Sequence, residues 1–167
     1  MATPNNPASG PETAPAPAPW YAAFPEPRTS PVATIPREKV LATLKDASLV
    51  SGRDYVLVDL RRTDFEGGTI RGSINLPAQS FYTTLPAVYN LFKASGVKKV
   101  IFYCGSSRGR GSRATGWLAD HIANEGDTNM QSLALAGGIK GWAVAGEEYI
   151  NWMDGYDAAV WAKSGEQ

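Results

Sequence analysis

The sequence predicts an α/β fold in which a central, mostly parallel sheet is covered by helices on both faces. Residues 55–60 and 100–103 form short, largely apolar runs, which are typical of strands that are buried on both sides. Segments with helical periodicity alternate with such runs, and this alternation predicts parallel strands joined by helical crossovers. In sheets of this kind a functional site lies beyond the carboxyl ends of the strands.

The length of 167 residues fits one domain with a short tail. Residues 1–19 hold six of the twelve prolines, and we expect them to form a disordered Pro/Ala-rich tail. A ligand for a proline-recognition domain is the alternative interpretation of this tail. Residues 20–167 are then a single domain, onto which Trp20, Tyr21 and Phe24 dock the chain. A binding site for a partner is the alternative interpretation of these aromatic residues.

Charge and cysteine content exclude several classes of protein. The formal net charge is zero and no run of like charges occurs, so we expect neither nucleic acid nor a membrane as a partner. No apolar stretch approaches the roughly 18 residues of a membrane span, and the N-terminus lacks the pattern of a secretory signal. One cysteine and one histidine cannot form an internal disulfide or the usual zinc clusters. These features predict a cytoplasmic or nuclear protein without a metal.

The first half of the domain reads as a helix followed by two strands. Thr34 can cap a helix that has Pro36 in its first turn. The apolar face of this helix consists of Val40, Leu41 and Leu44. The strand at 55–60 leads into a loop at 61–68 that is rich in glycine and charge, and residues 74–77 form a second short strand that ends at proline.

The second half continues the alternation of helices and strands. Residues 84–94 predict a helix with Pro86 near its start. Another helix begins near Ser112, and residues 132–136 form a strand that is closed by two glycines. The apolar face of the helix after Ser112 consists of Ala114, Trp117, Leu118, His121 and Ile122. The aromatic residues between 142 and 161 predict a packed C-terminal helix.

The central feature is the segment that follows the strand at 100–103. Cys104, the only cysteine, is followed by small residues and then by Arg110, which gives the pattern C-x5-R. Small residues allow the backbone to curl so that its N–H groups point inward and form a nest for an anion. The next helix adds its free N–H groups and the positive end of its dipole. The predicted oxyanion-binding loop comprises Gly105, Ser106, Ser107, Arg108 and Gly109.

The pattern predicts two catalytic residues, Cys104 and Arg110. The guanidinium of Arg110 can bind two oxygens of an oxyanion with a charge that it cannot lose. The same positive field favours a thiolate, and a thiolate beneath the bound anion is placed for in-line attack on its central atom. A buried structural cysteine is the alternative, but strand, cysteine, small loop, arginine and helix together favour a functional site.

Four segments of the chain resemble signature blocks of the rhodanese superfamily. Residues 56–61 and 65–77 resemble its first block, residues 102–104 its active-site strand, and residues 137–142 its closing G-G-x-x-G-W block. The resemblance covers about residues 35 to 145 and implies a rhodanese-like fold. The superfamily includes sulfurtransferases, cell-division-cycle dual-specificity phosphatases, arsenate reductases and modules without activity.

Loop length separates the activities that this resemblance implies. Sulfurtransferases of the superfamily have a six-residue loop, whereas its phosphatases and arsenate reductases have seven residues, as Cys104 to Arg110 does. Residues 110–113 are similar to the R-G-P-R that follows the phosphatase loop, with Ser112 in place of proline. The loop lacks the carboxylates of the phosphatases and is more similar to that of the arsenate reductases. A sulfurtransferase that carries a persulfide on Cys104 and a non-catalytic interaction module are the alternatives.

Two positions depart from the pattern of these enzymes. Tyr103 stands where a histidine usually precedes the cysteine, and Thr69 stands where a histidine is common. Neither change removes the nucleophile or the arginine, but both bear on the catalytic rate. Asp59 and Arg113 are candidate supporting residues of the site.

The sequence does not identify a proton donor for ester hydrolysis. His121, the only histidine, lies about 13 Å along its helix from the loop, so we expect it to serve in packing. The resemblance implies that Asp59 is structural and pairs with a nearby arginine such as Arg61 or Arg71. The remaining candidates on the adjacent loop, which we expect to be solvated charges, are Asp64 and Glu66.

The lone cysteine constrains the reductase pathway, because no internal thiol can resolve an adduct on Cys104. The resemblance to rhodanese-fold arsenate reductases therefore implies glutathione as an external reductant, together with a glutaredoxin. The expected ligands are phosphate, arsenate or a phosphorylated substrate, with no bound cofactor.

Overall fold

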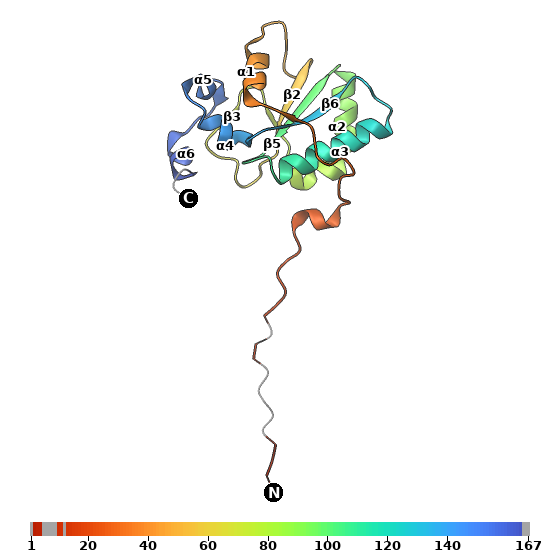
Figure 1. Cartoon of the computed structure of the whole chain (residues 1–167), viewed down its shortest axis with the longest axis vertical. Helices are drawn as coiled ribbons and strands as arrows, with labels where there is room; N and C mark the ends of the chain where they lie inside the picture. Colours follow the sequence, from red (N-terminus) through yellow and green to blue (C-terminus); the bar gives the residue numbers. More distant parts are fainter. Residues whose placement is uncertain (1, 5–9, 12, 165–167) are drawn as a thin grey trace.

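The computed structural model of the chain describes residues 2–4, 10–11 and 13–164, and its centre is a five-stranded parallel sheet (Figure 1). The strand order is β1-β6-β5-β2-β4, and each neighbouring pair is parallel. The strands are β1 (Thr34–Ile35), β2 (Tyr55–Asp59), β4 (Ile74–Asn75), β5 (Lys99–Tyr103) and β6 (Gln131–Leu135). The prediction of a mostly parallel sheet is confirmed.

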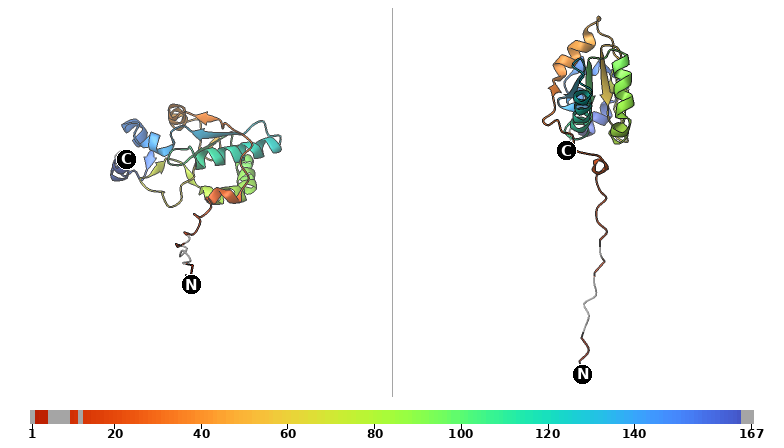
Figure 2. Two further views of the ribbon diagram at one scale, coloured as in Figure 1. Left: turned by 60° about the horizontal axis from the view of Figure 1, so that its bottom comes forward. Right: turned by 90° about the vertical axis from the view of Figure 1, so that its right-hand side faces the viewer.

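Helices cover both faces of the sheet, as predicted. One face packs against α2 (Ala78–Ala94) and α3 (Arg110–Asn124), and the other packs against α1 (Arg37–Lys45), α4 (Gly138–Ala143) and α6 (Ala158–Ser164). In the right-hand view of Figure 2, α1 and α2 lie on opposite sides of the sheet.

Side chains of the two central strands alternate between these faces, because successive residues of a strand point in opposite directions. Val56 and Val58 of β2 belong to the core under α2 and α3, whereas Leu57 belongs to the core under α1 and α4. Phe102 and Tyr103 of β5 divide in the same way. Both faces exclude water, which explains why these strands are apolar along their whole length.

Three predicted helix starts differ from the observed ones, by two to six residues. Thr34 does not cap α1, because it pairs with Ala134 in the parallel ladder between β1 and β6. α2 begins at Ala78 rather than near residue 84, and it continues through Pro86. Its buried residues share one face that extends across the proline, and they are Ala78, Phe81, Leu85, Tyr89 and Phe92. α3 begins at Arg110, two residues before the predicted start.

The predicted C-terminal helix over residues 142–161 is also wrong. The chain there forms the end of α4, the short helix α5 (Glu147–Ile150), the strand β7 (Met153–Asp154) and then α6. β7 pairs antiparallel with β3 (Thr69–Ile70) in a separate two-stranded sheet. The aromatic residues pack as predicted, but glycines with positive φ at 146 and 155 break the segment into short pieces.

Residues 20–33, the N-terminal strap, cross the outside of α2 and α3 before the chain enters β1. The strap begins with the 3-10 helix η1 (Trp20–Ala23), and Trp20 and Phe24 both make edge-to-face contacts with Trp117 of α3. The predicted docking of the aromatic residues is therefore confirmed. The described residues before the strap form no helix or strand and are exposed, whereas disorder of residues 1–19 stays a prediction.

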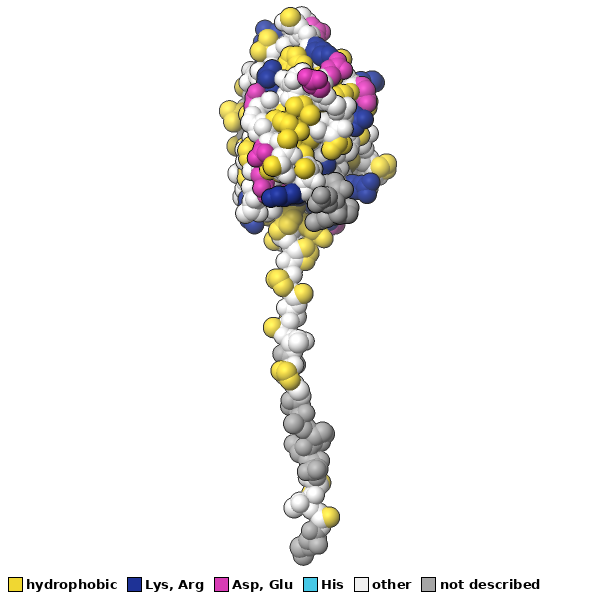
Figure 3. All heavy atoms as spheres, turned by 90° about the vertical axis from the view of Figure 1, so that its left-hand side faces the viewer, with side chains coloured by type: hydrophobic (Ala, Val, Ile, Leu, Met, Phe, Trp, Pro, Cys, Tyr) yellow, Lys and Arg dark blue, Asp and Glu magenta, His cyan; other side chains and the backbone are white. Residues whose placement is uncertain are grey.

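The surface shows no patch of one charge on the face that Figure 3 presents, where acidic and basic side chains are interspersed among apolar ones. Within the described residues, no helix is long and apolar enough to cross a membrane. The same part of the chain contains no group of three or more His, Cys, Asp or Glu side chains that could hold a metal ion.

Candidate active site

Cys104 lies directly after the carboxyl end of β5, in a pocket of about 430 Å³. The residue is only 3% exposed, and it belongs to the core beneath α2 and α3. The register of the sheet places the end of β2 beside the end of β5, since Asp59 pairs with Tyr103. The thiol therefore lies at the sheet edge where parallel α/β proteins bind their ligands.

The loop after Cys104 curls back over the thiol. The amide of Ser107 donates a hydrogen bond to Sγ of Cys104 at 3.2 Å. Ser107 has a φ of 63°, which is a left-handed conformation that a residue with a side chain adopts at a cost of about 1 kcal/mol or more. This strained turn brings the backbone close enough to surround the sulfur.

Several amides of the loop and of the first turn of α3 have no acceptor within the described residues. They include the amides of Gly109, Arg110 and Gly111. α3 begins at this point, so its unpaired N–H groups and the positive end of its dipole lie beside the thiol. The arrangement suits an anion with several oxygens.

α4 fixes the start of the loop from the other side. The amides of Ile139 and Lys140 donate to the carbonyl oxygens of Cys104 and Gly105, each at 3.0 Å. Gly138 makes this contact close, because a Cβ built there would lie 2.4 Å from the Gly105 oxygen. Gly138 of the closing sequence block thus lets the helix touch the loop backbone.

Ser112 and Gly111 fix the far end of the loop. The hydroxyl of Ser112, which stands in place of a proline in the related phosphatases, donates to the carbonyl oxygen of Ser107 at 3.0 Å. A Cβ built on Gly111 would lie 2.9 Å from Cβ of Ser107 and 3.8 Å from Sγ of Cys104. Glycine at this position therefore allows the helix to begin directly beside the sulfur.

Arg110 forms a bidentate ion pair with Asp64, which lies on the loop after β2. Nη1 and Nη2 donate to the two carboxylate oxygens at 2.8 and 2.5 Å. Hydrogen bonding to Arg110 lowers the pKa of Asp64 to about 2, although partial burial opposes this shift. Asp64 is exposed, as expected, but its charge is paired with Arg110 and not free in solvent.

Asp59 pairs with Arg61, one of the two arginines that were expected. Both side chains are buried, at 0% and 2% exposure, and Nη2 of Arg61 lies 2.8 Å from Oδ2 of Asp59. The same guanidinium donates to the carbonyl oxygens of Glu66 and Gly68 at 2.8 and 2.7 Å. Asp59 does not line the pocket, but it holds the loop that carries Asp64.

Tyr103 and Thr69 belong to the same buried network. The Thr69 hydroxyl donates to Oδ2 of Asp59 at 2.8 Å, and the Tyr103 hydroxyl accepts from the Ile70 amide at 3.3 Å. Burial, reinforced by the negative charge of Asp59, raises the pKa of Tyr103 far above its ordinary value. Tyr103 therefore stays neutral and acts as a structural link beneath the site.

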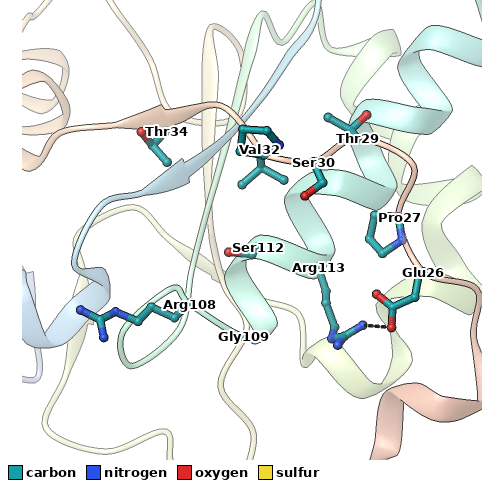
Figure 4. A pocket seen from close by; sticks show the side chains of 11 residues that line it. Glu26, Pro27, Thr29, Ser30, Val32, Thr34, Arg108, Gly109, Ser112 and Arg113 are labelled. Atoms are coloured by element: carbon teal, nitrogen blue, oxygen red, sulfur yellow. Dashed lines mark hydrogen bonds and ion pairs between the residues drawn. The ribbon is translucent and has the colours of Figure 1, made fainter.

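Arg113 joins the pocket to the N-terminal strap. Its guanidinium lies 3.5 Å from the ring centroid of Tyr21, and Nη1 donates to Glu26 at 2.8 Å. Figure 4 shows the pair of Arg113 and Glu26 at a second pocket, where Arg108 points away from Arg113. Two of the predicted loop residues differ in exposure: Arg108 is exposed at this second pocket, whereas Ser107 is buried.

The pocket above Cys104 has further walls that were not predicted from sequence. These walls are formed by Trp20, Tyr21, Gln79 and Lys140. The predicted residues that also line the pocket are Cys104, Gly105, Ser106, Gly109, Arg110 and Arg113. Lys140 lies within the closing G-G-x-x-G-W block, which follows the carboxyl end of a strand, so its place near the site could have been inferred. Gln79 and the two aromatic residues carry no such signal, since only folding brings their segments to the loop.

His121 does not line the pocket around Cys104. Its ring packs edge-on against Tyr89 of α2, with 4.7 Å between the ring centroids, and Nε2 lies 3.8 Å from Glu125. These contacts agree with the expectation of a packing role.

Comparisons with known proteins identify the family of the chain. The chain matches the Rhodanese-like domain family over residues 39–145. It is 29% identical over 97 residues to Arsenical-resistance protein 2 of Saccharomyces cerevisiae, a match that covers 54% of this chain and 75% of the yeast protein.

Two solved structures share the fold. An As-Sb reductase from Leishmania major superposes with a TM-score of 0.58 at 21% identity, covering 64% of this chain and 73% of that protein. A yeast protein tyrosine phosphatase of the rhodanese family superposes with a TM-score of 0.65 at 21% identity, covering 80% of this chain and 99% of that one. Because the family match spans more than half of the chain, the protein belongs to the Rhodanese-like domain family.

Proposed function

We propose that the protein performs thiolate chemistry on a tetrahedral oxyanion, with arsenate as the substrate and Cys104 as the nucleophile. The observation that carries this proposal is the placement of one buried thiol beneath the free amides of the loop and of α3. The guanidinium of Arg110 stands at the same pocket. An oxyanion bound by these donors would have its central atom in line with the sulfur.

The first step forms a bond between sulfur and arsenic. The Cys104 thiolate attacks the arsenic of hydrogen arsenate, and one oxygen leaves as water after it takes a proton from solvent. Arg110 and the free amides hold the remaining oxygens and balance their charge. No change in oxidation state occurs in this step.

The second step reduces arsenic from the pentavalent to the trivalent state. The thiolate of an external thiol, glutathione, attacks Sγ of Cys104, and the sulfur–arsenic bond breaks with its electron pair left on arsenic. Arsenite leaves, and a mixed disulfide remains between Cys104 and glutathione. A second thiol, supplied with a glutaredoxin, reduces this disulfide, because the chain contains only one cysteine.

The protonation state of the carboxylate in the pocket favours arsenate over a phosphate ester as the substrate. Ester hydrolysis needs a proton for the leaving oxygen. Asp64 is the carboxylate of the pocket, and with a pKa of about 2 it is ionised at neutral pH and has no proton to give. Arsenate reduction expels water and depends less on a positioned acid. The name of the 29% identical yeast relative, Arsenical-resistance protein 2, supports the same substrate.

Phosphatase activity at the same site is the second candidate, and the shape of the pocket favours it. The volume of about 430 Å³ is larger than a bare oxyanion requires, and the N-terminal strap adds the aromatic walls Trp20 and Tyr21. Such walls suit the ring of an aryl ester. Arsenate reduction and aryl-phosphate hydrolysis would then share the nucleophile and the arginine.

Three assays on the full chain test the proposal. They measure arsenate-dependent NADPH oxidation with glutathione, glutaredoxin and glutathione reductase, aryl-phosphate hydrolysis, and thiocyanate formation from thiosulfate and cyanide. We expect saturable arsenate reduction that is lost in Cys104→Ser. Arg110→Lys keeps the charge but not the bidentate geometry, and we expect it to lower kcat/KM by about 10²-fold or more.

Arg62→Lys is the matched control for Arg110→Lys, because Arg62 is exposed on the neighbouring loop and does not line the pocket. We expect this variant to retain wild-type rates. Thiocyanate formation alone would overturn the proposal in favour of a sulfurtransferase. Inactivity in all three assays would overturn it in favour of an interaction module.

A further inference from the structure

The pocket contains a carboxylate that oxyanion binding does not require. Asp64 lines it together with three cations, Arg110, Arg113 and Lys140. A carboxylate beside a bound oxyanion repels it unless the carboxylate charge is neutralised. The presence of Asp64 among these cations therefore needs a physical account.

Arg110 neutralises Asp64 in the structure, and it does so with both of its terminal nitrogens. The two oxygens of the carboxylate accept from Nη1 and Nη2 at 2.8 and 2.5 Å. Two oxygens of a tetrahedral oxyanion would approach the guanidinium in the same bidentate way. An incoming anion must displace Asp64 from these nitrogens or bind beside its negative charge.

The position of Asp64 is fixed by the loop at 61–68. The buried guanidinium of Arg61 donates to three backbone carbonyls of this loop, including that of Asp64 at 3.4 Å. The amide of Arg62 donates to Oδ1 of Asp64 at 3.2 Å, which orients the carboxylate. Asp64 is thus anchored to the core through Arg61 and Asp59, so its position does not depend on Arg110 alone.

We propose that Asp64 is an internal competitor of the oxyanion for Arg110, and this inference rests on the function proposed above. Asp64 occupies the terminal nitrogens of the guanidinium in the resting protein, and the oxyanion takes them as it binds. Asp64 therefore acts through Arg110 as a positioning residue. It sets the affinity of the site for tetrahedral anions below the affinity that the loop alone would give.

The competition predicts a specific change in the affinity of the site for oxyanions. Removing the carboxylate frees Arg110 and removes a negative charge, so oxyanions bind more tightly. An exposed ion pair of this kind corresponds to about a two- to tenfold change in affinity. The effect appears in KM for arsenate, in the same direction as the change in phosphate affinity.

Equilibrium binding of inorganic phosphate, measured by isothermal titration calorimetry, tests the inference without any turnover. We expect Asp64→Ala and Asp64→Asn to bind phosphate about two- to tenfold more tightly than wild type. Asp64→Glu keeps a carboxylate near Arg110 and restores an affinity close to wild type. Glu66→Gln is the matched control, because it removes one negative charge from the same loop and Glu66 makes no ion pair within the described residues.

A double-mutant cycle identifies Arg110 as the group through which Asp64 acts. In an Arg110→Ala background, Asp64→Ala can only relieve repulsion and frees no guanidinium, so its gain in phosphate affinity should be clearly smaller than in the wild-type background. Unchanged or weaker phosphate binding in Asp64→Ala would overturn the inference, as would an equal gain in the Arg110→Ala background. If arsenate is not reduced but the phosphate cycle gives the expected result, the proposed function fails while the competition stands.

Discussion

The hydroxyl of Tyr103 lies 2.8 Å from the hydroxyl of Thr69, so the two positions that lack the histidines of related enzymes contact each other. Thr69 in turn donates to Asp59, whose carboxylate pairs with Arg61. The two departures therefore form one uncharged link between the end of β5 and the loop that carries Asp64. This link is structural, since neither residue lines the pocket.

Removing the Tyr103 hydroxyl tests this link. Tyr103→Phe leaves the buried Ile70 amide and two hydroxyls without their partner, and we expect a loss of about 1–3 kcal/mol in the free energy of unfolding. Urea denaturation measures the loss. Tyr82→Phe is the control, because the Tyr82 hydroxyl makes no hydrogen bond within the described part of the chain, and equal losses in the two variants would argue against the link.

The contact between α4 and the loop predicts that Gly138 cannot be replaced. In Gly138→Ala the new methyl group would lie 2.4 Å from the carbonyl oxygen of Gly105, so the loop must move and activity should fall at least about tenfold. Gly126→Ala is a matched control, since Gly126 has a φ of 64° against 58° at Gly138 but no atom within 4 Å of the added Cβ.

Comparing the two alanine variants separates the clash from the backbone strain. We expect Gly126→Ala to lose about 1–2 kcal/mol of stability and no activity. The loss of activity in Gly138→Ala is then due to displacement of the loop. Full activity in Gly138→Ala would show that α4 does not position the nucleophile.

The buried pair of Asp59 and Arg61 is expected to dominate local stability. Asp59→Asn leaves the guanidinium of Arg61 buried at 2% exposure without its counter-charge, and the expected loss is about 3–5 kcal/mol. Asp54→Asn removes the partner of the exposed Arg53 and should cost far less stability. Thermal unfolding compares the variants, and amide hydrogen exchange over residues 61–68 should increase in Asp59→Asn alone.

The attachment of the N-terminal strap should weaken in acid. Burial raises the pKa of Asp120, but hydrogen bonds from the Thr29 hydroxyl and from the amides of Arg28 and Thr29 outweigh this effect and leave the pKa below 3.8. Because the folded pKa is lower than the unfolded one, the stabilisation is complete well above pH 3.8 and is lost as the pH falls below that value.

Limited trypsin digestion follows the strap, because Arg28 is 68% exposed. At neutral pH, Asp120→Asn should be cleaved after Arg28 faster than wild type, and its stability deficit of about 1–3 kcal/mol should shrink as the pH falls below 3.8. A deficit that does not change with pH would contradict the role of the Asp120 charge.

The fold was predictable where local pattern determines it. The long apolar runs of β2 and β5 carry their own signal because both faces of the sheet are buried. β1 and β7 have two residues each, so their pattern is too short to be read. Their pairing depends on contacts between distant segments, such as Thr69 with Asp154, and the sequence does not reveal these contacts.

In the candidate site, too, only the residues within one continuous segment were predictable. Cys104 and Arg110 lie in one continuous loop, whose spacing indicates the chemistry before the fold is known. Asp64 lies 46 residues from Arg110, and its role as ion-pair partner arises only when the sheet brings β2 beside β5. Tyr21 reaches the pocket from the other end of the chain, because the strap docks on α3.

The covalent state of Cys104 during turnover tests the central claim most directly. The protein is incubated with glutathione in the presence or absence of arsenate, and its mass is determined by intact-protein and peptide mass spectrometry. We expect one glutathione bound to Cys104 only when arsenate is present, with phosphate suppressing the adduct by competition. Modification that is independent of arsenate, or its absence under both conditions, would rule out Cys104 as the nucleophile toward arsenate.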